Sequence, residues 1–282
     1  MERGIRRVEI LQAIILGVVQ GLTEFLPVSS TAHLVLFPIF LGWKANGLAF
    51  DVALHIGTLV AVFGYFRNDL LAILKGGLRS LRKPDLAGDP DQRMAWFLVV
   101  SCLPAVIAGL FFEDKVATVL RHPLVIGVAM LAFSIVLLVA ERVGVRTKDL
   151  RSMGWREALM VGFAQALAII PGASRSGVTM TAGLFGGLRR EAAARFSFLL
   201  GSPIILGAAI LESRHLLEDP NLSWSVVGAG ILASGVSGYM CIRFLLRYLR
   251  ENSTMVFIVY RLVVGAILVA LALTGRLPEG VA

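Results

Sequence analysis

Charged residues are scarce in this sequence. Only 16% of its 282 residues are Asp, Glu, Lys or Arg, whereas a soluble domain usually has roughly 25%. Hydrophobic residues make up 57%, which is more than the interior of a soluble domain of this size can hide. The apolar runs are long and do not alternate with polar residues, which excludes the short alternating strands of a membrane β-barrel. These absences favour an all-α polytopic membrane protein, because helices satisfy their own backbone hydrogen bonds in lipid.

Cysteine is also rare. The two cysteines, Cys102 and Cys241, both lie in apolar stretches, so we interpret them as small core residues rather than as a disulfide. The basic N-terminal segment resembles a signal peptide, but no small-residue cleavage site follows it. We therefore treat it as part of the mature protein.

Six segments are apolar and long enough to cross a bilayer, which takes roughly 20 residues. They lie approximately at residues 50–67, 94–112, 123–141, 194–213, 223–246 and 255–275. Two further apolar regions, 8–42 and 156–187, are each interrupted by polar residues, proline and glycine. Because each half of these regions is too short to span a membrane, we predict that both regions are re-entrant helical hairpins.

The basic residues lie between the apolar runs rather than in one patch. In the predicted topology, seventeen Lys and Arg residues fall in the connections on one side and eight on the other. The richer side is expected to be cytoplasmic, and both termini then lie outside. This distribution is typical of a topology signal and predicts no nucleic-acid partner.

The two interrupted regions resemble each other. Gly17-x-x-Gln20 precedes the first break and Gly162-x-x-Gln165 precedes the second. The hairpins enter from opposite sides in the predicted topology. The similarity therefore predicts an inverted repeat within one membrane domain (1–282), with halves of approximately 1–122 and 123–282. The broken tips would meet near the bilayer midplane. Chance matching of common residues is the alternative.

Ionisable residues lie in or beside both breaks. Each costs about 2.5 to 3.5 kcal/mol within a membrane, so Glu24, His33 and Arg175 need a compensating role. Gln20 and Glu24 are four residues apart and share a helix face. Ser30 and His33 are three apart and share another. Phosphoryl transfer would use such a set, which offers a nucleophile, a proton carrier, a cationic clamp and a carboxylate able to hold a divalent ion.

Serine and threonine residues lie beside these ionisable groups, at the start of the second half-helix of each hairpin. They are Ser29, Ser30 and Thr31 in the first hairpin, and Ser174, Ser176 and Thr179 in the second. Free N–H groups and the positive end of a helix dipole favour phosphate, and a guanidinium binds phosphate oxygens in pairs. The set therefore predicts an anion site. The alternative is that the hydroxyls only cap the half-helices while Glu24 pairs with Arg175.

Residues Gln20–His33 and Pro171–Thr179 resemble the two signature motifs of the bacterial undecaprenyl-pyrophosphate phosphatase family, also called the bacitracin-resistance family. The likeness covers essentially the full chain, including the segment from Phe50 to Thr58 and the Tyr260-Arg261 pair. It implies hydrolysis of the C55 lipid pyrophosphate to lipid monophosphate and inorganic phosphate. It also implies dependence on a divalent cation (Mg²⁺ or Ca²⁺), a multi-pass location in the bacterial inner membrane and a site that opens outward. The family has Glu or Gln four residues before its invariant Glu, and here that position is Gln20, so Glu24 is the one expected metal ligand.

Spacing and resemblance together suggest a mechanism. Ser30 would attack the terminal phosphorus with His33 as its base, Arg175 would stabilise the phosphoryl oxygens, and Glu24 would bind the cation or orient His33. Attack by His33 itself or directly by water stays open. The residues expected to bind substrate are Gln20, Ser29, Thr31, Gly172, Ser174, Ser176 and Thr179.

A transporter or flippase of a phosphorylated lipid or anionic solute is the competing class, because broken helices and a midplane anion site are also typical of transporters. A nucleophile with a neighbouring base favours the enzyme. Asp51 and His55 share a helix face, and either an interfacial pair or a contact to pyrophosphate would explain them. Arg261 lies within an apolar segment and needs a partner. The expected partners are a polyprenyl pyrophosphate and the bilayer, with a possible homodimer.

Overall fold

The computed structural model describes residues 2–43, 47–118, 122–218 and 223–275. Within these residues the secondary structure is helical except for turns and one isolated β-bridge between Lys148 and Leu188. The helices are α1 (Glu2–Phe25), α2 (Ser30–Leu41), α3 (Gly47–Tyr65), α4 (Arg67–Ser80), α5 (Pro90–Thr118), α6 (Pro123–Val143), α7 (Trp155–Ala166), the 3₁₀ turn η1 (Leu167–Ile169), α8 (Arg175–Phe185), α9 (Arg190–Glu218), α10 (Trp224–Glu251) and α11 (Met255–Leu273).

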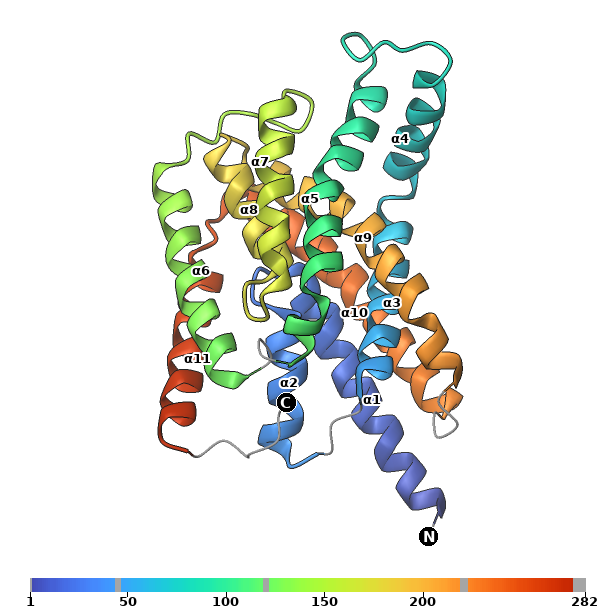
Figure 1. Ribbon diagram of the computed structural model, residues 1–282, viewed down its shortest axis with the longest axis vertical. Coiled ribbons are helices and arrows are strands. Elements are labelled where there is room, and N and C mark those ends of the chain that lie inside the picture. The colour runs from blue at the N-terminus through green and yellow to red at the C-terminus, as the bar shows by residue number, and fades with distance from the viewer. Residues whose placement is uncertain (1, 44–46, 119–121, 219–222, 276–282) are drawn as a thin grey trace.

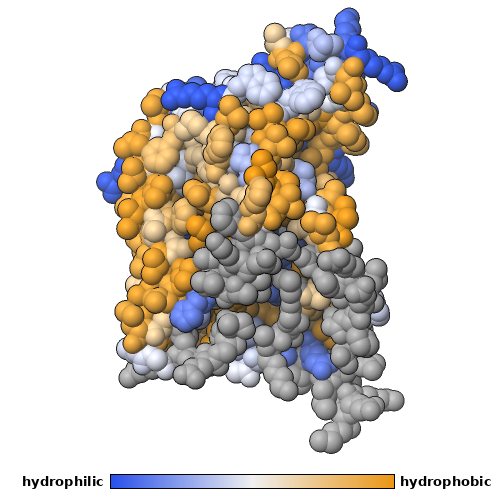
Figure 2. Space-filling view, viewed as in Figure 1, coloured by the Kyte–Doolittle hydropathy of each residue, from blue (hydrophilic) through white to orange (hydrophobic). Residues whose placement is uncertain are grey.

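The predicted membrane-spanning helices are confirmed by length and composition. Five described helices are long and apolar enough to cross a bilayer, namely α5, α6, α9, α10 and α11. A sixth candidate is the pair of α3 and α4, which pass the same test together as one span and meet at a bend of 82°. Figure 2 shows the consequence, because hydrophobic side chains cover the flank of the molecule and hydrophilic ones gather at one end. The chain is therefore a multi-pass membrane protein.

The two interrupted regions form helical hairpins. The first consists of α1 and α2, and the second of α7, η1 and α8. The hairpins enter from opposite ends of the molecule, and their tips lie near its middle (Figure 1). One detail of the prediction is wrong: α1 has 24 residues and is about 36 Å long, so the first half-helix is not short. It begins at Glu2, within the basic segment that we had placed outside the hairpin.

The second half-helices of the two hairpins begin in the same way. Ser29 precedes α2 with φ 76°, and Ser174 precedes α8 with φ 71°. Each serine hydroxyl accepts a hydrogen bond from a backbone N–H three residues on. Ser30 and Arg175 are consequently the first residues of equivalent half-helices. The inverted repeat stays a prediction, and these matching caps support it.

Arg261 joins the two tips. It is 1% exposed, and its Nη1 donates to the carbonyl oxygens of Pro27 (3.2 Å) and Ala173 (3.1 Å). Its Nη2 donates to the carbonyls of Gly172 and Ala173, at 3.0 Å each, while Nε donates to Ser134 Oγ at 2.8 Å. The main partners of this intramembrane arginine are therefore backbone carbonyl oxygens from both breaks.

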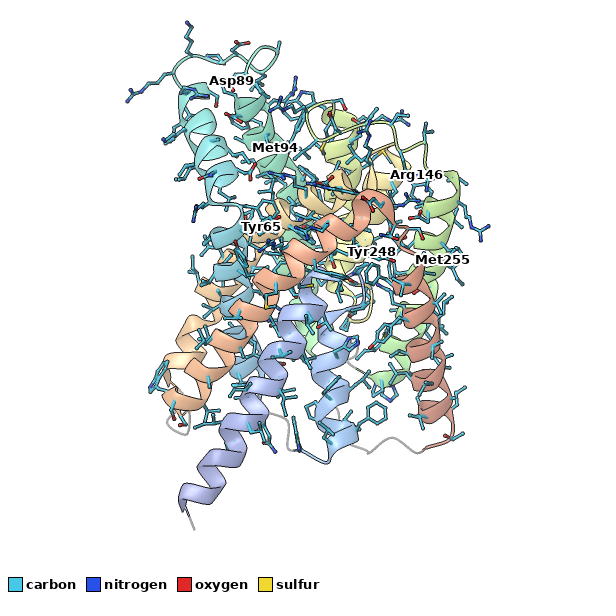
Figure 3. The ribbon with its side chains drawn as sticks, turned by 180° about the vertical axis from the view of Figure 1, so that it is seen from behind. Tyr65, Asp89, Met94, Arg146, Tyr248 and Met255 are labelled. Carbon is cyan, nitrogen blue, oxygen red and sulfur yellow. The ribbon has the colours of Figure 1, made fainter. Side chains whose placement is uncertain are left out.

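The hydrophilic end is held together by ion pairs. Arg195 pairs with Asp69 at 2.7 Å, and Lys148 with Glu157 at 2.7 Å. Glu141 pairs with Arg190 and, at 2.9 Å, with Arg146. Figure 3 places Arg146 and Asp89 toward this same end of the molecule. The basic connections that the sequence analysis assigned to one side thus do share one side.

Small residues allow close contact between the helices that carry the site. A Cβ at Gly21 of α1 would overlap Ser237 of α10, and one at Gly162 of α7 would lie 2.7 Å from the Cα of Ser101 in α5. Such close approaches are typical of membrane helices, which associate through packing rather than through the hydrophobic effect. They fix α1 and α7 and hence the position of both tips.

Candidate active site

A cavity of about 340 Å³ lies where the two tips meet. Its polar lining comes from both hairpins and from α3, and consists of Glu24, Ser29, Ser30, Thr31, His55, Gln165, Gly172, Ser174 and Arg175. Its apolar wall comes mainly from η1 and from four residues of α9, Ile204, Ile205, Ala208 and Ala209. The cavity therefore has a charged end and an apolar end, which suits an amphipathic ligand.

Glu24 is the centre of the polar network. Its Oε2 accepts hydrogen bonds from Ser30 Oγ at 2.7 Å and from Gln20 Nε2 at 3.2 Å. Its Oε1 forms an ion pair with Arg175 Nη2 at 3.0 Å, and His55 Nε2 lies 3.6 Å from Oε2. Glu24 is 7% exposed. One buried carboxylate thus links the predicted nucleophile of the first hairpin to the arginine of the second.

Arg175 is held against α9. Its Nη1 donates to the carbonyl oxygen of Ser197 at 2.9 Å, and a Cβ at Gly201 would overlap its guanidinium. Its Nε is buried and has no hydrogen-bond partner among the described residues. Native proteins pair nearly all buried polar groups, so this unpaired N–H on a residue of the cavity lining is a donor that a ligand would satisfy once the side chain turns toward it.

The serines at the tips act as helix caps, as the alternative interpretation held. Ser29 Oγ accepts from Ala32 N at 3.4 Å, and Ser174 Oγ accepts from Gly177 N at 3.2 Å. Both serines nevertheless line the cavity. Their positive φ angles cost about 1 to 3 kcal/mol each, and such strained residues cluster at functional sites. Gly172, with φ 92°, lies where a Cβ would come within 2.5 Å of the Ile126 carbonyl oxygen.

The expected pairing of Ser30 with His33 is wrong. Ser30 donates to Glu24 instead. His33 Nδ1 lies 2.7 Å from the carbonyl oxygen of Ser29, so it must be the protonated nitrogen, and His33 Nε2 lies 2.6 Å from the Tyr260 hydroxyl. His33 does not line the cavity. The physical reason is that the first turn of α2 directs Ser30 toward α1 and His33 toward α11.

Three further predicted site residues also lie outside the cavity lining. Ser176 Oγ donates to the carbonyl of Leu26 at 3.0 Å, which joins the two tips. Thr179 Oγ1 lies 2.7 Å from Ser197 Oγ, which attaches α8 to α9. Gln20 donates to Glu24. In this geometry Ser176 and Thr179 support the site rather than contact its contents. Gln20 differs, because it lies against Glu24 and its Oε1 has no hydrogen-bond partner among the described residues.

Sequence reasoning missed or underrated four residues of the site. His55 lines the cavity beside Glu24, with Nδ1 held by the carbonyl of Asp51 at 2.7 Å. Gln165 lines it from α7, and the shared Gly-x-x-Gln pattern was a signal for it. Tyr260 belonged to the quoted Tyr260-Arg261 pair, but nothing in local spacing connected it with His33. Ser197 gave no signal, because it lies far in sequence from the hairpin residues that it contacts.

The residues present supply oxygen ligands for a hard cation. Within the described chain, no three His, Cys, Asp or Glu side chains come together as a metal-binding group. Glu24 is a carboxylate, and the Oε1 atoms of Gln20 and Gln165 are buried without hydrogen-bond partners in that same part of the chain. Mg²⁺ and Ca²⁺ take carboxylate and amide oxygens together with phosphate oxygens. The donor set therefore fits a cation that binds with a phosphorylated ligand.

Comparison with known proteins finds relatives over most of the chain. A family model described as "Bacitracin resistance protein BacA" matches residues 13–267. The chain is 47% identical over 267 residues to "Undecaprenyl-diphosphatase 2" of Stutzerimonas stutzeri (strain A1501), covering 93% of this chain and 98% of that protein. It is 46% identical over 265 residues to "Undecaprenyl-diphosphatase" of Thioalkalivibrio sulfidiphilus (strain HL-EbGR7), covering 93% and 99%. It is 47% identical over 262 residues to the protein of that name in Moorella thermoacetica, covering 93% and 97%.

Proposed function

The chain belongs to the bacitracin resistance protein BacA family, and we propose that it hydrolyses undecaprenyl pyrophosphate to undecaprenyl phosphate and inorganic phosphate. The observation that carries the proposal is the hydrogen bond from Ser30 to Glu24 beside Arg175. A nucleophile, its proton acceptor and a guanidinium converge in one cavity with an apolar wall. Such an enzyme recycles the lipid carrier for peptidoglycan synthesis and confers resistance to bacitracin.

The first chemical step starts at Ser30. Its Oγ attacks the terminal phosphorus while Glu24, which already accepts its hydrogen bond at 2.7 Å, takes the proton. The Oγ–P bond forms, the bridging P–O bond breaks, and Glu24 gives the proton to the departing lipid monophosphate. In the second step, water attacks the phosphoserine. Glu24 accepts a proton from that water and returns it to Ser30 Oγ as inorganic phosphate leaves.

Charge stabilisation comes from the second hairpin. In this mechanism the phosphoryl oxygens accept hydrogen bonds from Arg175, whose Nε–H has no partner among the described residues, and from the backbone N–H groups that begin α8. A divalent cation held by Glu24 and the Gln20 amide oxygen would neutralise charge on the pyrophosphate. His33 serves as a positioning residue in this mechanism, since its two nitrogens are engaged by Ser29 and Tyr260.

Location and orientation complete the proposal. We place the protein in the bacterial inner membrane with its basic end in the cytoplasm, following the excess of Lys and Arg there. The cavity then opens toward the outer side, where the lipid pyrophosphate is released. The possible homodimer stays a prediction.

A transporter is the second candidate, since the meeting of two broken helices suits it equally well. The bond from Ser30 to Glu24 favours hydrolysis, because a carrier of phosphate groups needs no nucleophile with a proton acceptor. The names of the relatives point the same way.

The test is phosphate release by purified protein in detergent from a long-chain prenyl pyrophosphate, with and without chelator. Arg175→Ala is expected to lower the rate by roughly 10²-fold or more, because it removes a transition-state donor. Arg156→Ala is the matched control, since Arg156 is exposed at the start of α7 and should leave the rate unchanged. If folded wild-type protein releases no phosphate with any divalent cation, hydrolysis is excluded, and uptake into liposomes becomes the next assay.

A further inference from the structure

Gln165 has a free oxygen that the hydrolytic mechanism does not use. It lies in the last turn of α7, is 2% exposed and lines the cavity. Its Nε2 donates to the carbonyl oxygen of Ser101 at 3.4 Å, while its Oε1 has no hydrogen-bond partner among the described residues. A buried carbonyl without a partner is rare in a native protein and calls for an explanation.

The orientation of this amide follows from its neighbour. The Ser101 carbonyl is an acceptor, so only the NH₂ group of Gln165 can face it favourably. The oxygen is therefore the group left over. It is buried in this structure, and rotation about the soft terminal torsion of the glutamine would turn it toward the cavity that the residue lines. A pyrophosphate offers further acceptors rather than donors, so the substrate alone cannot satisfy this oxygen.

A divalent cation satisfies it. Amide oxygens are ordinary ligands of Ca²⁺, and Mg²⁺ combines a few protein oxygens with phosphate oxygens. The first hairpin offers Glu24 and the free Oε1 of Gln20. Gln165 occupies the corresponding Gly-x-x-Gln position of the second hairpin. The two glutamines with unpaired amide oxygens thus occupy matching positions in opposite hairpins.

We propose that Gln165 is a ligand, from the second hairpin, of the divalent cation that binds together with the pyrophosphate. The proposal rests on the proposed function, because the pyrophosphate supplies the remaining oxygens. It follows that the cation bridges the two hairpins and that its affinity depends on a residue outside the Gln20–Glu24 pair.

The experiment measures Mn²⁺ binding directly. Mn²⁺ suits the same oxygen ligands as Mg²⁺, and the loss of its free electron paramagnetic resonance signal reports binding to the purified full-length protein. Methylenediphosphonate serves as a pyrophosphate that cannot be hydrolysed. The proteins are wild type, Gln165→Met, Gln165→Glu and the control Gln92→Met, which removes a buried glutamine with both amide atoms paired in the α4–α5 hairpin.

We expect Gln165→Met to weaken Mn²⁺ binding about tenfold or more, and Gln165→Glu to tighten it, because a carboxylate replaces a neutral oxygen. Gln92→Met should stay within about twofold of wild type. The cation concentration for half-maximal phosphate release should shift in the same order. Unchanged Mn²⁺ affinity in both Gln165 variants, with wild type binding Mn²⁺, would overturn the proposal. Failure of the wild type to release phosphate would instead overturn the proposed function.

Discussion

Gly201 does not itself line the cavity, but replacing it with alanine perturbs Arg175, which does. Gly201 lies on α9, and the methyl group of alanine would overlap the guanidinium of Arg175. Arg175 has to move, because the side chain is flexible at its end whereas α9 is a packed helix. Its bonds to the Ser197 carbonyl (2.9 Å) and to Glu24 (3.0 Å) cannot both survive that movement.

The expected effect is large for catalysis and small for stability. A displacement of about 1 Å in a catalytic group can lower a rate roughly 10²-fold, equivalent to about 2.7 kcal/mol of transition-state stabilisation. For folding, alanine in place of glycine within a helix gains about 1 kcal/mol, which offsets much of the overpacking cost of about 1 to 3 kcal/mol. The thermal unfolding midpoint in detergent should therefore change little while phosphate release falls.

The matched control is Gly207→Ala on the same helix, where an added Cβ meets no atom within 4 Å. Phosphate release from a prenyl pyrophosphate and thermal unfolding are measured for wild type, both alanine variants, Arg175→Ala and the double variant Gly201→Ala/Arg175→Ala. If the substitution acts through Arg175, the double variant is no slower than Arg175→Ala alone. Equal activity of Gly201→Ala and Gly207→Ala would refute the reasoning.

Three other outcomes are expected. Quenching with denaturant at mildly alkaline pH, which preserves both phosphoserine and phosphohistidine, should trap phosphate on Ser30 during turnover. Ser30→Ala should abolish the trapped species, and phosphate recovered on His33 would contradict the assigned nucleophile. Arg261→Lys should lower the thermal unfolding midpoint, because an ammonium group with three hydrogens replaces a guanidinium with five. Each carbonyl left unpaired costs about 1 to 3 kcal/mol. An unchanged midpoint would show that the packing of the tips does not depend on this residue. Chelator should abolish phosphate release and added Mg²⁺ or Ca²⁺ should restore it, whereas chelator-resistant release would remove the cation from the mechanism.

The helices and hairpins could be predicted from the sequence because their signals are local. Long apolar runs identify spans, and a proline or glycine beside polar residues identifies a break in a run. Reliance on local signals also explains why the predicted start of the first hairpin was wrong. Hydropathy separates the basic N-terminal segment from the apolar run that follows, but α1 continues through that segment to Glu2. A helix requires no apolar residue where it leaves the membrane.

The partners of the site residues could not be predicted in the same way. Ser30 and His33 share a helix face by spacing, but a face can serve two neighbours, and here α2 lies between α1 and α11. His33 meets Tyr260, 227 residues away in sequence. Arg261 likewise contacts carbonyl oxygens, which every residue carries and no sequence pattern marks. Spacing along one helix shows which side chains share a face, but it does not show which neighbouring helix each of them contacts.

The charges at the meeting of the tips explain why this centre suits an anion. Arg175 and Arg261 bring two positive charges, and Glu24 brings one negative charge. The N–H groups of Arg261 donate to backbone carbonyls and a serine hydroxyl. These neutral acceptors satisfy its hydrogen bonds but do not neutralise its positive charge. Among these three residues at the tips, positive charge therefore exceeds negative charge. An unbalanced charge is unfavourable inside the membrane. A pyrophosphate offsets that excess, and its cation then balances the negative charge that the ligand adds.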